Sequence, residues 1–262
     1  KIDAHSDFCP WSEIMEFRGT GRKIYDGSEA GVPYLHGVVV RKDLADDYPE
    51  VVQAFIKAVY DAGKWIKEDP IRATDLMEKW TGVEKEVLYI YFSKGGHLSL
   101  DPTIKPAWTE ALKFDHTVLV KEKAIPPLDF GDWITEKYIR AAYKDMGVDY
   151  DKDKAAVVNP VEANAGLPNE IWHARDGIKA YATLPEFLGA IAKFRATGAK
   201  INSTYVYDKE TGLKLFGKTA FWVVTPKGEF ATFLRRGEAE KYAGTIDGKV
   251  ITFEDAIGMK SS

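Results

Sequence analysis

Cysteine is nearly absent from this sequence, because Cys9 is the only one in 262 residues. A single cysteine excludes a disulfide within the chain and any zinc or iron–sulfur site that needs several cysteines. Long apolar runs are also absent: the longest, such as GVVV and TAFWVVT, have the length of a strand. They fall far short of the ~20 residues that cross a bilayer as a helix. The chain therefore has to rely on an ordinary apolar core.

Excess positive charge is the next feature that the sequence lacks. Lys and Arg number 36 against 40 Asp and Glu, which gives a net charge of -4, and the basic residues form no block along the chain. Proteins that bind nucleic acid need such blocks to contact phosphates, so this class is excluded.

Motifs of nucleotide binding and hydrolysis are missing too. RGTGRK lacks the spacing of either glycine-rich nucleotide motif, and neither Gly-x-Ser-x-Gly nor His-Glu-x-x-His occurs. No pair of carboxylates has a spacing that suits acid–base catalysis. We therefore expect that the chain is not an enzyme and that it has no cofactor.

Apolar residues make up 45% of the chain, and their spacing predicts both helices and strands. The predicted helices lie at about 10–19, 43–70, 71–80, 83–93, 105–123, 132–147, 184–198 and 237–245. The predicted strands lie at about 21–29, 34–42, 97–101, 200–208, 217–226, 228–234 and 249–253. The second of these, YLHGVVVRK, is expected to be buried because it is apolar and β-branched.

The character of the chain changes near residue 150. The stretch 151–168 has a charged start, two prolines and a glycine, and it is typical of a linker. Residues 1–150 are therefore expected to form one domain and residues 169–262 a second, compact α+β domain.

The first domain resembles a known family. KIDAHSDFCPWSEI, YLHGVVVRKDLADDYPEVVQAFIKAVYDAGKWIKEDP and LDFGDWITEKYIRAAYKDMG occur in the order found in type II periplasmic substrate-binding proteins of the sulfonate, taurine and nitrate ABC-transporter group. The resemblance implies an α/β fold of which this chain holds the C-terminal part, with an N-terminal half missing or supplied by another chain. It also implies an extracytoplasmic, periplasmic location, with a membrane anchor in the missing N-terminus as a variant of this prediction.

The same resemblance implies a function. A small polar organic ligand of the sulfonate, taurine or nitrate class would be held in a cleft between two lobes, and the closed form would dock on a membrane permease. The implied ligand contacts are His5, Ser6, Asp7, Phe8, Trp11, Tyr34 and His36. Asp7 is unfavourable beside an anion, so a cationic or neutral polar ligand is the alternative.

Alternating polar residues in the first segment give a second interpretation. His5, Asp7 and Cys9 would share one face of a strand, where imidazole, carboxylate and thiolate could bind a metal ion. The other histidines have plainer predictions. His97 and His116 are expected at the surface, and His173 with Arg175 is expected to be an exposed pair at a strand edge.

The second domain resembles, more weakly, the NosL-like module of copper-delivery lipoproteins. AKINSTYVYDKETGLKLFGKTAFWVV and FLRRGEAEKYAGTIDGKVITFEDAI carry the resemblance. That family binds Cu(I) through sulfur, whereas this half has no cysteine and only Met259, so its copper binding is not expected here.

Three alternatives to solute transport remain open. They are a copper-handling accessory protein, an enzyme of the same fold that makes a thiamine precursor, and a subunit that another chain completes. The enzymes of the second kind carry a cysteine-rich iron motif, which this stretch does not show.

Overall fold

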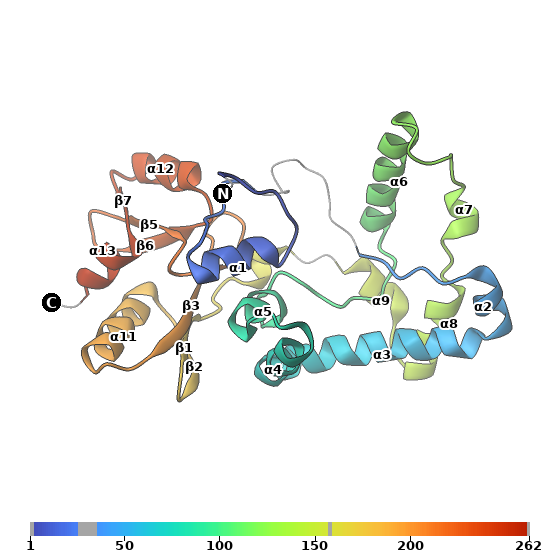
Figure 1. Cartoon of the computed structure of the whole chain (residues 1–262), viewed down its shortest axis with the longest axis horizontal. Helices are drawn as coiled ribbons and strands as arrows, with labels where there is room; N and C mark the ends of the chain where they lie inside the picture. The colour runs from blue at the N-terminus through green and yellow to red at the C-terminus, as the bar shows by residue number, and fades with distance from the viewer. Residues whose placement is uncertain (1–2, 26–35, 157–158, 261–262) are drawn as a thin grey trace. The chain divides into compact units, whose positions relative to one another are not determined.

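The computed structural model describes residues 3–25, 36–156 and 159–260, and these divide into two compact units (Figure 1). The structure confirms the predicted mixture of helix and sheet. The units are made of the following segments: unit 1 of Lys1–Ile24, Ile66–Ser99 and Val158–Ser262, and unit 2 of Tyr25–Trp65 and Leu100–Val157.

The helices of unit 1 come from all three of its segments. They are α1 (Trp11–Arg18), α4 (Pro70–Thr81), α5 (Lys85–Phe92), α10 (Pro160–Ala163), α11 (Leu184–Ala196), α12 (Arg236–Thr245) and α13 (Phe253–Gly258). Capping residues fix several of their ends. α4 begins at a proline after Asp69, whose side chain accepts a hydrogen bond from the Arg72 N–H, and α1 ends at Gly19, which has a φ of 69°.

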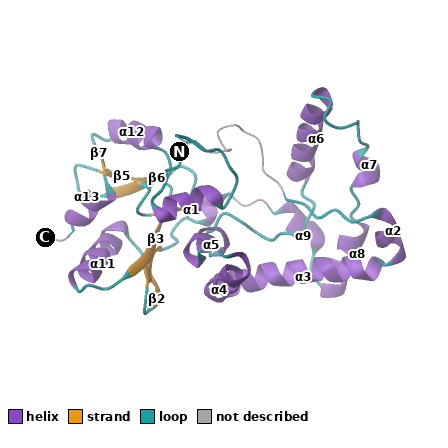
Figure 2. Cartoon of the chain, viewed as in Figure 1, coloured by secondary structure: helices purple, strands orange, loops and turns teal. Residues whose placement is uncertain are grey.

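Two antiparallel sheets lie in unit 1, and Figure 2 shows their strands in orange. The first sheet has the order β2-β1-β3-β4 and the second has the order β6-β5-β7. The strands are β1 (Asn169–His173), β2 (Gly177–Tyr181), β3 (Ile201–Tyr207), β4 (Lys214–Phe216), β5 (Phe221–Val224), β6 (Phe230–Phe233) and β7 (Lys249–Ile251). The predicted hairpin at Gly212 joins β3 to β4, and this glycine has a φ of 69°.

The two sheets repeat one motif. β1–β2–α11–β3 and β5–β6–α12–β7 have the same order of elements and the same strand order. Their registers agree as well: Glu170 pairs with Ala180 and Tyr205, and Trp222 pairs with the equivalent Thr232 and Ile251. The C-terminal part of the chain is therefore a duplicated ββαβ unit.

Helices cover both faces of the first sheet. On one face, Phe187, Leu188 and Ile191 of α11 pack with Ile171 of β1 in a buried cluster that also contains Trp222. On the other face, Trp172, Tyr205 and Phe216 pack with residues of two helices from the N-terminal part of the chain: Ile14 of α1 and Val87, Tyr89, Ile90 and Tyr91 of α5. α5 is apolar nearly all round, which explains why it is buried on this face.

The described part of unit 2 consists of helices and loops (Figure 2). Its helices are α2 (Lys42–Asp47), α6 (Pro106–Lys121), α7 (Phe130–Trp133), α8 (Lys137–Met146) and α9 (Tyr150–Ala155), together with most of α3 (Pro49–Glu68). Its core is small: Ile139, Tyr143 and Tyr150 are buried, and α6 buries only Ala111. Among the described residues, no helix combines the length and the hydropathy that crossing a membrane requires.

The predicted buried strand at 34–42 is wrong over its described part. Residues 36–40 are neither helix nor strand, and 74% of Val38 and 71% of Val39 are exposed. The β-branched run satisfies a local preference, but no neighbouring strand is available to it within the described residues. A strand needs such a partner, because local preference alone contributes little.

The grouping of segments also differs from the domain boundaries expected at 150 and 168. Residues 1–24 and 66–99 cluster with 158–262, because α1 and α5 cover the first sheet. The stretch 151–168, expected to be a linker, contains most of α9 and all of α10. Asn164 ties it to unit 1 through side-chain hydrogen bonds to the carbonyl oxygens of Gly95 and Gly212, at 3.2 and 2.8 Å.

Candidate functional site

The bend before α1 carries most of the ligand contacts expected from the sequence, and it lies at the surface. His5, Ser6, Asp7, Phe8 and Trp11 are all exposed, and Phe8 and Trp11 expose 60% and 51% of their surface. The Asp7 carboxylate accepts hydrogen bonds from the Phe8 N–H at 2.8 Å and from the His5 ring at 2.9 Å, and these two contacts lower the pKa of Asp7. The bend therefore offers one oriented carboxylate and two aromatic surfaces to a ligand.

Two expected contacts remain, Tyr34 and His36. Tyr34 is outside the described residues, and His36 is exposed in a loop of unit 2, whereas the bend belongs to unit 1.

The structure does not assemble the alternative metal site at His5, Asp7 and Cys9. Cys9 packs against the buried cluster of Tyr91 and Trp172, and burial, with the nearby Glu13 carboxylate, raises the pKa of its thiol. Over residues 3–25, 36–156 and 159–260, no three His, Cys, Asp or Glu side chains come together as a metal site would require.

A small polar pocket lies next to the bend, beneath α1. It offers about 20 Å³ to the centres of water molecules, which is room for about one water. Its polar lining comes from distant parts of the chain and includes Glu13 and Glu16 of α1, Lys23, His97 and Lys214. Its apolar lining is formed by Ile90, Leu215, Phe216, Ala220 and Leu234.

An ion pair dominates this pocket. Lys23 Nζ lies 2.6 Å from Glu13 Oε1, and the side chains of Lys23 and Glu13 are 17% and 6% exposed. Burial alone would raise the pKa of Glu13, but the Lys23 ammonium and the hydrogen bonds that Glu13 accepts hold it at about 2. The carboxylate is therefore charged at neutral pH.

For two other titratable groups of the pocket, Glu16 and His97, burial shifts the pKa toward the neutral form. Burial raises the pKa of Glu16, although its Oε1 accepts a hydrogen bond from the Lys23 N–H at 3.3 Å. Burial also lowers the pKa of His97, whose Nε2 donates to the Lys214 carbonyl oxygen at 2.6 Å. His97 was expected at the surface, and the structure instead places its ring against Tyr91, with 5.6 Å between the ring centroids.

We expect the Glu13 ion pair to make stability depend on acid pH. The folded pKa of about 2 is below the ordinary 4.5, so the stabilisation is complete above pH 4.5 and is lost as pH falls toward 2. The loss should be about 3 kcal/mol of unfolding free energy. Urea unfolding across this range should show a steep decline that Glu13→Gln flattens.

The control for this prediction is Glu110→Gln, because 71% of the Glu110 side chain is exposed. It should leave the pH dependence of the unfolding free energy unchanged. A wild-type profile that Glu13→Gln does not alter would contradict the assignment.

A second buried charge lies behind the pocket. Lys214 Nζ is fully buried and contacts Glu170 Oε2 at 2.6 Å and Ser93 Oγ at 2.7 Å. The rings of Tyr89, Tyr205 and Tyr207 surround the ammonium at 4.8 to 5.7 Å from their centroids. Two hydrogen-bond acceptors and three aromatic rings thus surround the ammonium, and this cluster connects α5 with the first sheet.

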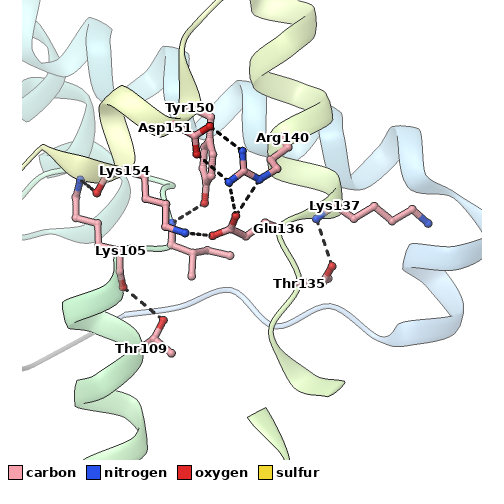
Figure 3. A network of polar contacts seen from close by, with 10 residues as sticks. Lys105, Thr109, Thr135, Glu136, Lys137, Arg140, Tyr150, Asp151 and Lys154 are labelled. Carbon is pink, nitrogen blue, oxygen red and sulfur yellow. Dashed lines mark hydrogen bonds and ion pairs between the residues drawn. The ribbon is translucent and has the colours of Figure 1, made fainter. Parts of the chain in front are cut away.

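A network of charges in unit 2 fixes α9 on α8 (Figure 3). Arg140 donates to both carboxylate oxygens of Asp151, at 3.1 and 2.8 Å, and its guanidinium lies 4.6 Å from the Tyr150 ring centroid. Glu136 accepts from Arg140 and from Lys154. Both carboxylates of the network, Glu136 and Asp151, are paired with cations. The network is therefore best explained as a set of ion pairs that holds α9 against α8.

Two further histidines are held by contacts within the fold. His173 is buried, and its Nδ1 accepts from the Asp176 N–H at 3.0 Å, so the predicted exposed pair with Arg175 is wrong. His173 ends a central strand, where α11 covers it with Phe194. His116 is half-buried, and its Nε2 accepts from the Leu128 N–H at 2.9 Å.

Partial signals for the pocket are present in the sequence. Glu13 and Glu16 have the spacing that places two side chains on one face of the predicted helix at 10–19. Lys214 lies on a short strand between apolar residues, which is unusual for an exposed lysine. No local pattern connects these positions with Lys23 or His97.

Comparisons with known proteins provide no assignment for this site. No family model matches the chain, and a search of the curated proteins found no match.

Proposed function

We propose that this chain is the solute-binding component of an ABC transporter, and that it captures a small polar organic molecule rather than converting it. The observation that supports this most is the bend before α1, where Phe8 and Trp11 expose aromatic surfaces beside the oriented Asp7 carboxylate. Binding sites for small polar solutes combine such apolar walls with a few placed polar groups.

The type II periplasmic-binding-protein-like fold of the N-terminal part and the NosL-like fold of the C-terminal part belong to the same proposal. So does an extracytoplasmic location. The sulfonate, taurine and nitrate class supplies the ligands to try first. Within that class the Asp7 carboxylate at the bend favours a solute that carries an ammonium group, as taurine does, over a simple anion.

Exposed apolar side chains in unit 2 support contact with another polypeptide, which in this proposal is the membrane permease. Apolar side chains that form a continuous patch on a folded protein are typical of an interaction site. The exposed residues include Val38, Val39, Leu44, Val51, Phe55, Phe114, Val118, Leu119, Leu128 and Trp133.

The test is calorimetric titration with taurine, methanesulfonate and nitrate. We expect one of them to bind the wild-type chain, and we expect Trp11→Ala to weaken that binding about tenfold or more, since loss of one aromatic wall removes 1.4 kcal/mol or more.

Trp80→Ala is the matched control, because Trp80 is 75% exposed on α4 of the same unit. It should leave the affinity unchanged. Absence of binding by all three solutes, or equal losses in both variants, would contradict the proposed function.

A further inference from the structure

The pocket beneath α1 already contains an ammonium group that the chain supplies to itself. Lys23 lies beyond Gly19, where α1 has ended, and its side chain reaches back to Glu13 on that helix. Because Lys23 follows the helix instead of belonging to it, its ammonium is a tethered group whose position depends on the segment that carries it.

The lining of this pocket suits an organic cation. Glu13 provides a buried carboxylate that is charged at neutral pH, and Glu16 provides a second carboxyl group one turn along α1. The floor is apolar, with Ile90, Leu215 and Phe216 among its residues. An alkyl chain that ends in an ammonium matches a carboxylate above an apolar floor, whereas a simple anion would meet two acidic groups.

A second observation points to an additional polar contact at this carboxylate. Tyr91 is 4% exposed, and its hydroxyl approaches the Glu13 carboxylate without reaching full hydrogen-bond geometry. The Glu13 carboxylate lies near enough to it to contribute, after burial, to raising the pKa of Tyr91. A buried hydroxyl whose hydrogen bond is incomplete is costly, and a small rearrangement around Glu13 would satisfy it.

We propose that this pocket is a recognition site for primary alkylammonium groups, and that Lys23 is its tethered occupant. A solute or partner with a primary amine binds by displacing the Lys23 side chain from Glu13. The site differs from the bend assigned above in all of its residues, so it does not depend on the proposed transport function.

The test replaces the tethered group with a free one. Lys23→Ala removes three methylene groups and the ammonium, which together correspond to propylammonium. The variant leaves the Glu13 carboxylate without its ion-pair partner and should lower the melting temperature. We expect propylammonium at about ten times its Kd to raise the melting temperature of Lys23→Ala by about 3 °C.

Wild-type protein should need at least about ten times more propylammonium for the same rise in melting temperature, because the added amine must compete with Lys23. Three probes test the chemistry in the variant: 1-propanol has the shape without the charge, propionate has the opposite charge, and tetramethylammonium has the charge without an N–H. None of them should stabilise Lys23→Ala. Equal effects of propylammonium and any of these probes would overturn the proposal.

Further variants locate the effect. Adding Glu13→Gln to Lys23→Ala should abolish the response to propylammonium, and Lys23→Met, which fills the space with a neutral chain, should show none. Lys241→Ala, at an exposed position on α12, is the matched lysine control and should behave as wild type.

If Lys23→Ala does not fold in buffer, its refolding yield with propylammonium and with 1-propanol becomes the measurement. Recovery with the amine alone supports the proposal, and recovery with neither overturns it.

Discussion

A fragment that contains only residues 159–262 is expected not to unfold cooperatively, although it includes both ββαβ repeats. In the full chain, α1 and α5 cover the face of the first sheet that Trp172, Tyr205 and Phe216 form. Exposing three large aromatic side chains would cost on the order of 5 kcal/mol, which is comparable to the whole stability of a small domain. Circular dichroism during urea titration should therefore show a broad, shallow transition.

The matched control joins residues 1–24 and 66–99 to 159–262 through flexible linkers, which rebuilds unit 1 without unit 2. This chain should regain a single steep transition, because the covering helices are present again. A steep transition in the 159–262 fragment alone would contradict the prediction and would mean that the sheet tolerates an open face.

This result bears on the expected division of the chain at residues 150 and 168. Local patterns predicted the longer helices and the later strands well, although α9, α10 and α13 were not predicted. β3, β5, β6 and β7 all lie within predicted strands, because each has an apolar or β-branched run of the right length. The division was expected from the composition of the stretch 151–168. Composition indicates where loops occur, but it does not indicate which segments contact one another. That α5 packs on β3 is a contact between residues more than a hundred positions apart, such as the Tyr205 hydroxyl and the Glu86 carbonyl oxygen.

The duplicated ββαβ motif shows the same limit. Its register agrees over three residues, before a bulge at Trp172 and His173 in the first copy, but Glu170 and Trp222 occupy equivalent positions and have opposite chemistry. Their surroundings explain the difference: Glu170 faces Lys214, whereas Trp222 packs between Phe187 and Phe253. A repeat whose equivalent residues meet different neighbours leaves little trace in the sequence.

The bend and the pocket differ in the same way, since one depends on neighbours in the sequence and the other on distant contacts. The bend could be proposed from the sequence, because its residues are neighbours along the chain and together carry the family resemblance. The pocket could not, since its composition requires knowing that Lys23, His97 and Lys214 converge on α1.

The Lys214 cluster should give the largest effect of a single substitution. Lys214→Ala is expected to lower the unfolding free energy of unit 1 by 3–5 kcal/mol, a magnitude typical of breaking a buried ion pair by removing one partner. The physical reason is that Glu170 keeps a carboxylate whose side chain is 13% exposed, with the Tyr89 hydroxyl at 3.0 Å as its remaining side-chain donor. Hydrogen exchange of the β1 and β4 amides reports this unit specifically.

The double variant Lys214→Met/Glu170→Gln separates the charge from the volume. Because no unpaired charge remains in it, its loss should be smaller than that of Lys214→Ala by about 2 kcal/mol, even though it lacks the ion pair. An exposed pair provides the contrast: Lys113 Nζ lies 2.8 Å from Glu110 Oε1 on α6, and Lys113→Ala should cost less than about 0.5 kcal/mol. If the double variant is as unstable as Lys214→Ala, the cluster acts through packing of the tyrosine rings around the lysine chain, and the charge is incidental to it.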